Sequence, residues 1–234
     1  MLVLNLGREP YQRIWELQHS LVKARQEGHL QDVLILLEHE PTITLGRNAD
    51  ARHILASEAT LVRSGIVVHR VERGGDVTYH GPGQLVGYPI VSLYDHHLSV
   101  SDYMHSLEDV IVSTLDDFGL RAERRKGLIG VWIGPRKVAA LGARVEHGIS
   151  YHGFAINVAP DLNHFELIVP CGLTDVRITS MQFELGTEVD PVLVRQRVVF
   201  HFGRVFCLST HETSLARLLG MCDASGDPRP VPFA

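Results

Sequence analysis

The sequence predicts an α+β fold class, in which mixed, largely antiparallel sheets are flanked by helices. The apolar runs typical of strands are short, hairpin turns join several of them, and only a few longer segments show helical periodicity. No linker rich in Gly, Ser or Pro and no shift in composition divides the chain of 234 residues. We therefore expect residues 1–222 to form a single domain around one main core.

The N-terminal part of the chain is expected to contain three strands and two helices. The strands are expected at residues 3–6, which suit a sheet edge, and at residues 32–38 and 42–45. The first helix begins near Pro10, because proline suits the first helical turn, and it ends at Gly28. The second begins near Ser57, whose side chain suits the N-cap, and it ends at Gly65.

A glycine-rich stretch, residues 72–84, lies between two apolar runs that are expected to be strands. Residues 66–71 are expected to form a buried strand, and residues 85–93 a second one. The stretch between them carries four glycines together with Arg, Asp, Thr, Tyr and His, and it is longer and more polar than a simple connection requires. We expect it to form one wall of a ligand pocket; an ordinary hairpin with a wide bulge is the alternative.

The second half of the chain is expected to surround a group of hairpin-linked strands with helices. Helices are expected at residues 101–118, where apolar residues mark one face, and at residues 190–206, which begin with an Asp-Pro pair. The strands between them are expected at residues 128–133, 138–145 and 153–158. A shorter amphipathic segment follows, and residues 223–234 are expected to be a flexible tail because they carry too little apolar surface to pack firmly.

Composition and charge exclude several classes of protein. A hydrophobic fraction of 45% and a charged fraction of 21% are those of a soluble globular protein. The net charge of −5 and the lack of an extended basic stripe argue against a nucleic-acid partner. No apolar run is long enough to span a membrane, and the start of the chain lacks the features of a signal peptide. Three cysteines without secretory cues indicate free thiols in a reducing compartment, so we expect a cytoplasmic location.

Three motifs occur in order through the middle of the chain. Residues 73–75, 78–80 and 83–89 read RGG, TYH and GQLVGYP; residues 136–142 read RKVAALG; and residues 168–173 read IVPCGL. Together they resemble the signatures of the lipoyl(octanoyl) transferase family. The first motif alone specifies many residue types over seventeen positions, so the resemblance is specific. It implies a fold similar to that of the biotin and lipoate protein ligases.

The resemblance also implies an activity and its partners. Members of this family move an octanoyl or lipoyl group from acyl carrier protein to a lysine of a lipoyl domain. The acceptors are the E2 subunits of the 2-oxoacid dehydrogenases and the glycine cleavage H protein. The family needs no ATP, no metal and no other cofactor. We therefore expect a monomeric acyltransferase of lipoate biosynthesis that binds neither nucleic acid nor membrane.

Cys171 is the candidate nucleophile for covalent acyl transfer. It lies between Pro170 and Gly172, outside any periodic segment, where a turn can direct its side chain towards a pocket. Cys207 falls within the last expected helix and is expected to be buried, whereas Cys222 stands at the start of the expected tail. Position alone leaves both a functional and a structural role open for Cys171. The resemblance implies that Cys171 is the nucleophile.

Lys137 is the candidate partner of Cys171. A thiol with a pKa near 8.5 is only a few per cent thiolate at pH 7, a deficit of about 2 kcal/mol that a neighbouring cation removes. A lysine at a strand end in water is the alternative for this position. The resemblance implies instead that Lys137 pairs with Cys171 and acts as the acid/base. In this mechanism Cys171 accepts the acyl group, and Lys137 then takes a proton from the attacking lysine amine.

Further residues match the family's substrate-binding segments. They are Arg73, Gly74, Gly75, Asp76, Val77, Thr78, Tyr79, His80, Ala140, Leu141, Gly142, Gly153, Phe154 and Ala155. The resemblance implies that these segments line the acyl tunnel and supply N–H donors for the tetrahedral oxyanion. Ala140 departs from the family pattern, in which serine is frequent.

His80, His152 and Gln84 are candidates for supporting roles. With Cys171, the two histidines also suggest a Cys/His hydrolase or a zinc site, but the sequence has no tight ligand spacing and no third carboxylate to complete one. We expect the histidines to orient the lysine or to donate to the substrate, and no metal to be bound.

Two other functions remain as alternatives. An ATP-dependent lipoate or biotin ligase shares the fold and the glycine-rich loop but needs no cysteine nucleophile. A non-catalytic module that binds acyl chains or carriers would show no turnover. The basic run at residues 121–126 is either a docking surface for an acidic carrier or a solvated loop.

Overall fold

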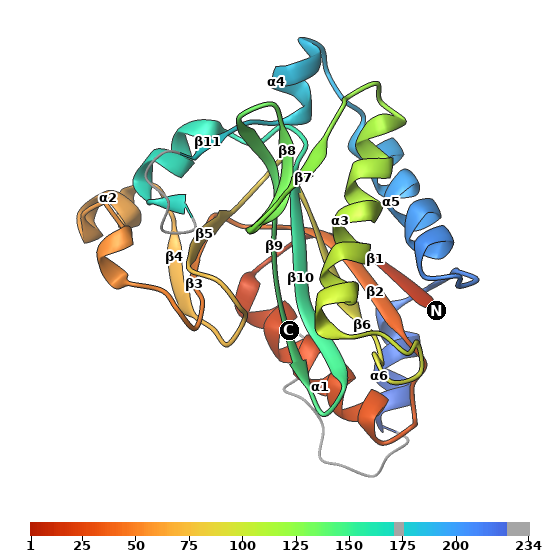
Figure 1. The fold of residues 1–234 in the computed structure, drawn as a ribbon. Coiled ribbons are helices and arrows are strands. Elements are labelled where there is room, and N and C mark those ends of the chain that lie inside the picture. Colours follow the sequence, from red (N-terminus) through yellow and green to blue (C-terminus); the bar gives the residue numbers. More distant parts are fainter. Residues whose placement is uncertain (171–175, 224–234) are drawn as a thin grey trace.

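A mixed β-sheet forms the centre of the computed structural model, which describes residues 1–170 and 176–223 (Figure 1). Its strands are β1 (Leu2–Glu9), β2 (Val33–His39), β6 (Gln84–Ile90), β7 (Glu123–Arg125), β8 (Leu128–Ile133), β9 (Arg136–Glu146), β10 (Ile149–Asn157), β11 (Arg177–Ile178) and β12 (His211–Thr213). The strand order is β12-β1-β2-β6-β10-β9-β8-β7, with β11 beside β9. The pairs from β2 to β7 along this order are antiparallel, whereas β1 runs parallel to both neighbours and β11 runs parallel to β9.

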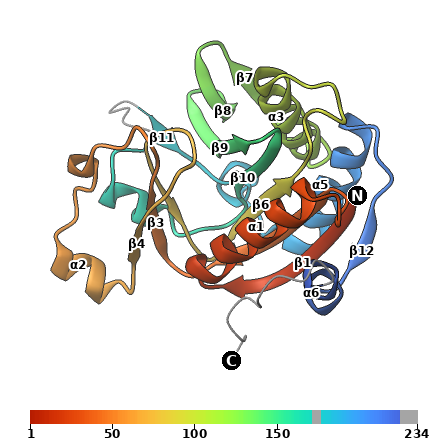
Figure 2. The ribbon, with the colours of Figure 1, turned by 90° about the horizontal axis from the view of Figure 1, so that it is seen from below.

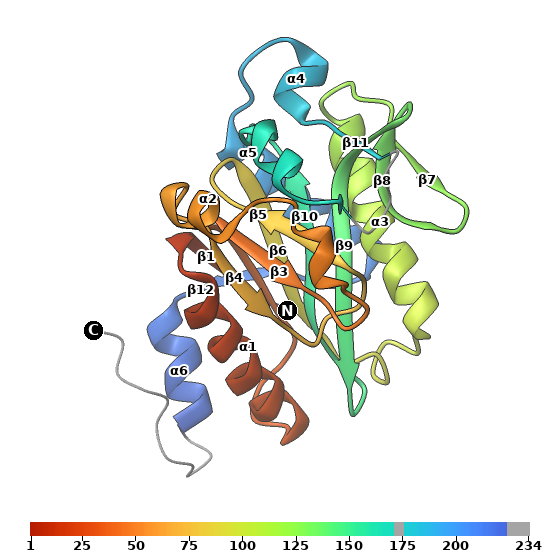
Figure 3. The same cartoon turned by 90° about the vertical axis from the view of Figure 1, so that its left-hand side faces the viewer.

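A smaller sheet lies beside β9 and β10 (Figure 3). Its strands are β3 (Thr42–Leu45), β4 (Val67–Arg70) and β5 (Val77–His80). The central strand β3 pairs in parallel with β4 and in antiparallel with β5. Ile43 and Tyr79 of this sheet pack against Phe165 and Ile168 in a separate small core. The 3₁₀ turn η2 (Leu162–Leu167) brings these last residues to the small sheet.

Helices cover both faces of the main sheet (Figure 2). On one face lie α1 (Tyr11–Gln26) and α6 (Leu215–Asp223), and on the other lie α3 (Val100–Asp116) and α5 (Pro191–Val205). The short helices are α2 (Glu58–Arg63), α4 (Met181–Leu185) and the 3₁₀ turn η1 (Ala51–His53). Because side chains alternate between the faces of a strand, the apolar run 33–37 of β2 contributes to the hydrophobic cores on both faces of the main sheet. Leu34 and Leu36 pack towards α3 and α5, and Ile35 packs towards α1.

The expected helices are confirmed, and local chemistry explains their ends. Ser57 and Asp190 cap α2 and α5, because their side-chain oxygens accept the N–H groups of Thr60 and Val192 at 3.2 Å and 2.8 Å. Pro10 immediately precedes α1, as the sequence predicted. None of the helices in the described part of the chain is both long and apolar enough to cross a membrane.

Three expectations about strands are wrong in detail. The strand predicted at residues 3–6 is longer and lies between β12 and β2, not at an edge. The strand predicted at residues 66–71 is buried only at its ends: Val67 and Val68 of β4, an edge strand of the small sheet, are 56% and 37% exposed, whereas Ile66 and Val71 are buried. The glycine-rich stretch is not one continuous loop, since β5 forms within it. Apolar composition favours a strand but does not show which neighbours will cover it.

The predicted division into a domain of residues 1–222 and a tail stays a prediction. Apart from Asp223, which ends α6, the residues of the tail lie outside the described residues.

Candidate active site

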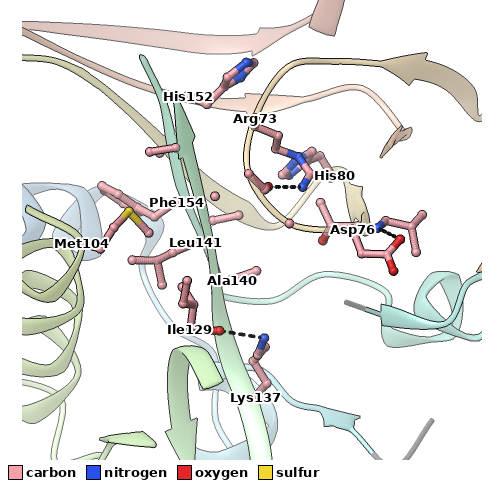
Figure 4. A pocket seen from close by; sticks show the side chains of 18 of the residues that line it. Arg73, Asp76, His80, Met104, Ile129, Lys137, Ala140, Leu141, His152 and Phe154 are labelled. Atoms are coloured by element: carbon pink, nitrogen blue, oxygen red, sulfur yellow. Dashed lines mark hydrogen bonds between the residues drawn. The ribbon is translucent and has the colours of Figure 1, made fainter. Parts of the chain in front are cut away.

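A cavity of about 480 Å³ lies between the small sheet, strands β9 and β10, and helix α3. The predicted site residues that line it are Arg73, Gly74, Gly75, Asp76, Val77, Thr78, His80, Lys137, Ala140, Leu141, Gly142, His152, Gly153, Phe154 and Ala155. Segments that are far apart in the sequence therefore meet around one cavity. The lining includes residues of the first two motifs and the segment 152–155, and their roles in substrate binding stay predictions. Figure 4 shows how these side chains surround the space.

The glycine-rich loop is held directly against β9. Gly74 donates its backbone N–H to Ala143 O at 3.0 Å. A Cβ at Gly142 would lie 2.9 Å from Gly74 O, so glycine at position 142 lets the two backbones approach this closely, and a Cβ at Gly74 would make a tight contact of 3.3 Å with Ala143 O. The Arg73 guanidinium is buried and donates to Thr44 Oγ1 and to Thr44 O at 2.7–3.1 Å. Arg73 therefore anchors the loop to β3.

Tyr79 and Gln84 do not line the cavity, although both were candidates. Tyr79 points into the core of the small sheet, where its ring packs on Phe165 and its hydroxyl lies 3.0 Å from His164 Nδ1. Thr78 and His80, its neighbours on β5, line the cavity instead, as the alternation of side chains along a strand requires. The Gln84 amide donates to Tyr79 O and to Asn157 Oδ1 at 3.2 Å and 2.9 Å, and so ties β5 to β10.

Lys137 lies within β9 and is only 3% exposed, so the alternative of a solvated lysine at a strand end is wrong. Its Nζ donates to Ile129 O at 3.0 Å and lies 5.0 Å from the centre of the Trp132 ring. Gly130 makes room for the side chain: with φ at +135°, a Cβ there would lie 2.8 Å from Lys137 Cε. The lysine is thus held at the end of the cavity formed by β8 and β9.

Cys171 lies outside the described residues. Before it in the sequence, the described chain runs to Pro170, and Val169 donates its N–H to His53 O at 2.7 Å; after it, the described chain resumes at residue 176 and leads into β11. In β11, Ile178 pairs with Lys137 itself, and Thr179 N–H donates to Lys137 O at 2.9 Å.

The other two cysteines do not lie where the sequence suggested. Cys207 is exposed and follows α5, and its φ of +54° ends the helix. It was expected to be buried because its neighbours in the sequence, Val205, Phe206 and Leu208, are apolar. Cys222 lies within α6, half-buried against the core beneath α1, and not in a tail.

His152 lies far from Lys137. In the pairing of β10 with β9, His152 is opposite Ala143, six residues along β9 from Lys137. At about 3.3 Å per residue this is about 20 Å, and Figure 4 shows the two side chains at opposite ends of the site. This separation argues against His152 as the residue that orients Lys137, and a role in donating to the substrate stays a prediction. Its Nε2 instead lies 3.4 Å from Glu72 Oε1, and its Nδ1 lies 3.4 Å from the Tyr11 hydroxyl.

Rings from four elements close the end of the cavity opposite Lys137. Tyr11 stacks with His80 and packs against His39, and His39 lies against Tyr88. His39 Nδ1–H donates to Glu9 O at 2.9 Å, so its Nε2 accepts the Tyr88 hydroxyl at 2.8 Å. Burial lowers the pKa of His39 to about 4 and lowers the pKa of His80 well below its usual range. Both imidazoles are therefore neutral at pH 7.

The buried His39 should make the fold sensitive to acid. Between about pH 6.5 and pH 4 the unfolded chain binds a proton at this position that the folded chain does not, so stability falls as the pH falls through this window. The shift corresponds to a loss of up to about 3 kcal/mol. In urea unfolding at pH 7 and pH 4.5, a His39→Gln variant should lose less stability on acidification than the wild type. His105→Gln, at an exposed position of α3, is the control, and an equal loss in wild type and His39→Gln would contradict the prediction.

Several lining residues were not predicted, and all of them except Tyr88, which stands in the first motif, lie outside the three motifs. They are Tyr11, Tyr88, Val100, Met104, Gly127, Leu128, Ile129 and Ala143. Val100 and Met104 are four residues apart on α3, so their spacing marks a second apolar stripe beside the main buried face. That stripe is the signal that could have indicated them.

The basic run at residues 121–126 contains the edge strand β7, which takes up residues 123–125, so the run is only partly a loop. Arg124 lies 3.4 Å from Asp109, and the Arg125 guanidinium lies 4.9 Å from the centre of the Trp132 ring. Among the described residues, no cluster of three or more His, Cys, Asp or Glu side chains is arranged to hold a metal ion.

Comparisons with known proteins agree with this architecture. The model of the lipoyl protein ligase A/B catalytic domain matches residues 10–203. The chain belongs to this family. An octanoyltransferase from Alkaliphilus metalliredigens is 45% identical to it, over 90% of this chain and 97% of the relative. One from Solibacter usitatus is 47% identical, over 86% and 90%.

Solved structures of a lipoate protein ligase and of a biotin protein ligase share the fold. A bi-partite lipoate protein ligase from Thermoplasma acidophilum superposes with a TM-score of 0.74 at 19% identity, covering 95% of this chain and 90% of that chain. Biotin protein ligase from Aquifex aeolicus is a more distant match, with a TM-score of 0.51 at 11% identity over 88% and 70%. The predicted α+β class and its similarity to the biotin and lipoate protein ligases are thus confirmed.

Proposed function

We propose that the chain is an acyltransferase that moves an octanoyl or lipoyl group from acyl carrier protein to a lysine of a lipoyl domain. The acyl group passes through a thioester on Cys171, and Lys137 acts as the acid/base. The acceptors are the lipoyl domains of 2-oxoacid dehydrogenase E2 subunits and the glycine cleavage H protein. The relatives named octanoyltransferase, matched over nearly their whole length, support this activity.

The observation that carries the proposal is a mainly apolar cavity with a buried lysine at one end. Leu141, Phe154 and Met104 line its walls, and Lys137 Nζ lies where β8 and β9 close it. Burying a hydrocarbon chain contributes about 0.8 kcal/mol per methylene, so an octanoyl chain would gain about 5 kcal/mol from such walls. A cavity of about 480 Å³ is within the usual range of ligand pockets.

The two half-reactions place different demands on the site. Attack of the Cys171 thiolate on the donor replaces one thioester with another, so this step is nearly balanced and needs no ATP. The acceptor amine must then lose a proton; with a reference pKa near 10.4, presenting it neutral at pH 7 costs about 4.6 kcal/mol. A buried amine such as that of Lys137 can take this proton as the amide forms. Backbone N–H groups of the glycine-rich loop, β9 and β10 are the proposed oxyanion donors.

The test is octanoyl transfer from loaded acyl carrier protein to a lipoyl domain without ATP. The wild type should turn over and carry an octanoyl mass on Cys171, and Cys171→Ala should lose both. Cys207→Ala, at an exposed position outside the cavity lining, is the matched control and should behave as the wild type. Full activity in Cys171→Ala contradicts the thioester. Dependence on ATP would identify a ligase, and acyl binding without turnover would identify a binding module.

The cellular setting belongs to the same proposal. We place the enzyme in the cytoplasm, acting as a monomer without a cofactor and without nucleic-acid or membrane partners. The acidic carrier is the donor, and the basic strand β7 is a candidate surface for its docking.

A further inference from the structure

Glu108 is a buried carboxyl on the inner face of α3 that the proposed mechanism does not use. It is 4% exposed, and its neighbours on this face, Leu107 and Ile111, are apolar. Burying a carboxyl group is costly unless hydrogen bonds compensate, and an apolar side chain of similar volume would pack here without that cost. A carboxyl at this position therefore calls for a specific explanation.

Its hydrogen bond reaches the peptide that binds Lys137. Glu108 Oε1 accepts the backbone N–H of Gly130 at 2.9 Å. The carbonyl of the same peptide unit, Ile129 O, accepts the Lys137 Nζ at 3.0 Å (Figure 4). Because a peptide unit is planar and rigid, the carboxyl on one edge determines where the carbonyl on the other edge points. Hydrogen bonds in series also polarise one another, so the carboxyl strengthens this carbonyl as an acceptor.

The pairing of β8 with β9 does not by itself fix the orientation of the Ile129–Gly130 peptide. The register of β8 with β9 shifts between Val131 and Trp132, immediately after it. Gly130 adopts a φ of +135°, outside the range that other residues favour. An irregularity of this kind in strand pairing redirects the neighbouring side chains. A further contact is then needed to hold the peptide in one orientation. Glu108 supplies that contact from the neighbouring helix.

We propose that Glu108 is a positioning residue for Lys137. By holding the Ile129–Gly130 peptide, it sets the location of the lysine amine relative to the cavity. This inference rests on the proposed role of Lys137 in acyl transfer. The competing explanation is that Glu108 only satisfies a buried N–H group and so contributes to stability alone.

Three variants separate these explanations. Glu108→Gln retains an oxygen acceptor, whereas Glu108→Met removes it and keeps a side chain of similar length. Thr114→Val is the matched control: Thr114 is a buried polar residue of the same helix, and its hydroxyl donates to Val110 O at 2.8 Å within α3. For each variant, kcat and KM for the loaded carrier are measured at saturating acceptor, together with Tm and the exchange rate of the Gly130 amide by NMR.

The expected result is a selective loss of kcat. Glu108→Met should lower kcat by about 10- to 100-fold, since small displacements of a catalytic group have effects of this size, with KM for the carrier unchanged. Its Gly130 amide should exchange faster. Glu108→Gln should recover most of kcat, and Thr114→Val should leave kcat unchanged.

The inference is overturned if Glu108→Met lowers Tm but keeps kcat within twofold of the wild type. It is also overturned if Glu108→Gln is as slow as Glu108→Met, or if Thr114→Val is equally slow. A wild-type chain that transfers no octanoyl group would refute the proposed function itself, which is a separate outcome.

Discussion

Replacing Lys137 with methionine should lower kcat for octanoyl transfer by about 10²- to 10⁴-fold, the usual contribution of a general acid or base. Methionine preserves much of the buried volume, so the fold and the acyl cavity should persist while the proton acceptor is lost. The defect should be largest in the second half-reaction, because the acceptor amine must be deprotonated there. Single-turnover measurements starting from octanoylated enzyme and lipoyl domain isolate that step.

A matched control is available for this variant. Lys23→Met makes the same change at an exposed position of α1, away from the cavity, and should leave kcat and KM unaltered. Circular dichroism and Tm should show that Lys137→Met is folded. If folded Lys137→Met transfers octanoyl groups from the preformed thioester within threefold of the wild-type rate, Lys137 is not the acid/base.

Replacing Gly153 with alanine should destabilise the fold by about 3 kcal/mol, the upper part of the usual range for overpacking. A Cβ at this position would lie 2.3 Å from Gly87 O and 2.7 Å from Pro89 Cδ. The first of these is backbone of the adjacent strand β6, so the clash cannot be relieved by moving one flexible side chain. For a chain of this size the loss corresponds to a fall in Tm of about 6–12 °C.

Gly220→Ala is the control for this prediction. Gly220 is exposed within α6, and no heavy atom lies within 4 Å of a Cβ placed there. Alanine should raise stability by about 0.5–1 kcal/mol, because glycine is the poorer helix former. Differential scanning calorimetry on both variants provides the comparison. A Tm for Gly153→Ala equal to that of the wild type would show that β6 and β10 can separate at little cost.

Most of the candidate residues named from the sequence line one cavity, for a reason that is partly local. The glycine-rich stretch and the lysine segment each carry a recognisable motif, residues 153–155 match a further segment of the family, and all three stretches line the cavity. Met104 and Ile129 were missed because they belong to elements without a motif. Tyr79 was wrongly placed in the lining because a motif match does not consider which face of a strand a side chain occupies.

Local chemistry was sufficient for the helices and most strand positions. Proline before the first helix, the Ser57 and Asp190 caps, and the apolar spacing of α3 act over a few residues, so they can be read along the chain. Which strands become edges, and which polar side chains become buried, depends on neighbours that are distant in the sequence. Lys137 is enclosed, and Glu108 is connected to it, only because α3, β8 and β9 pack together, which no local pattern specifies.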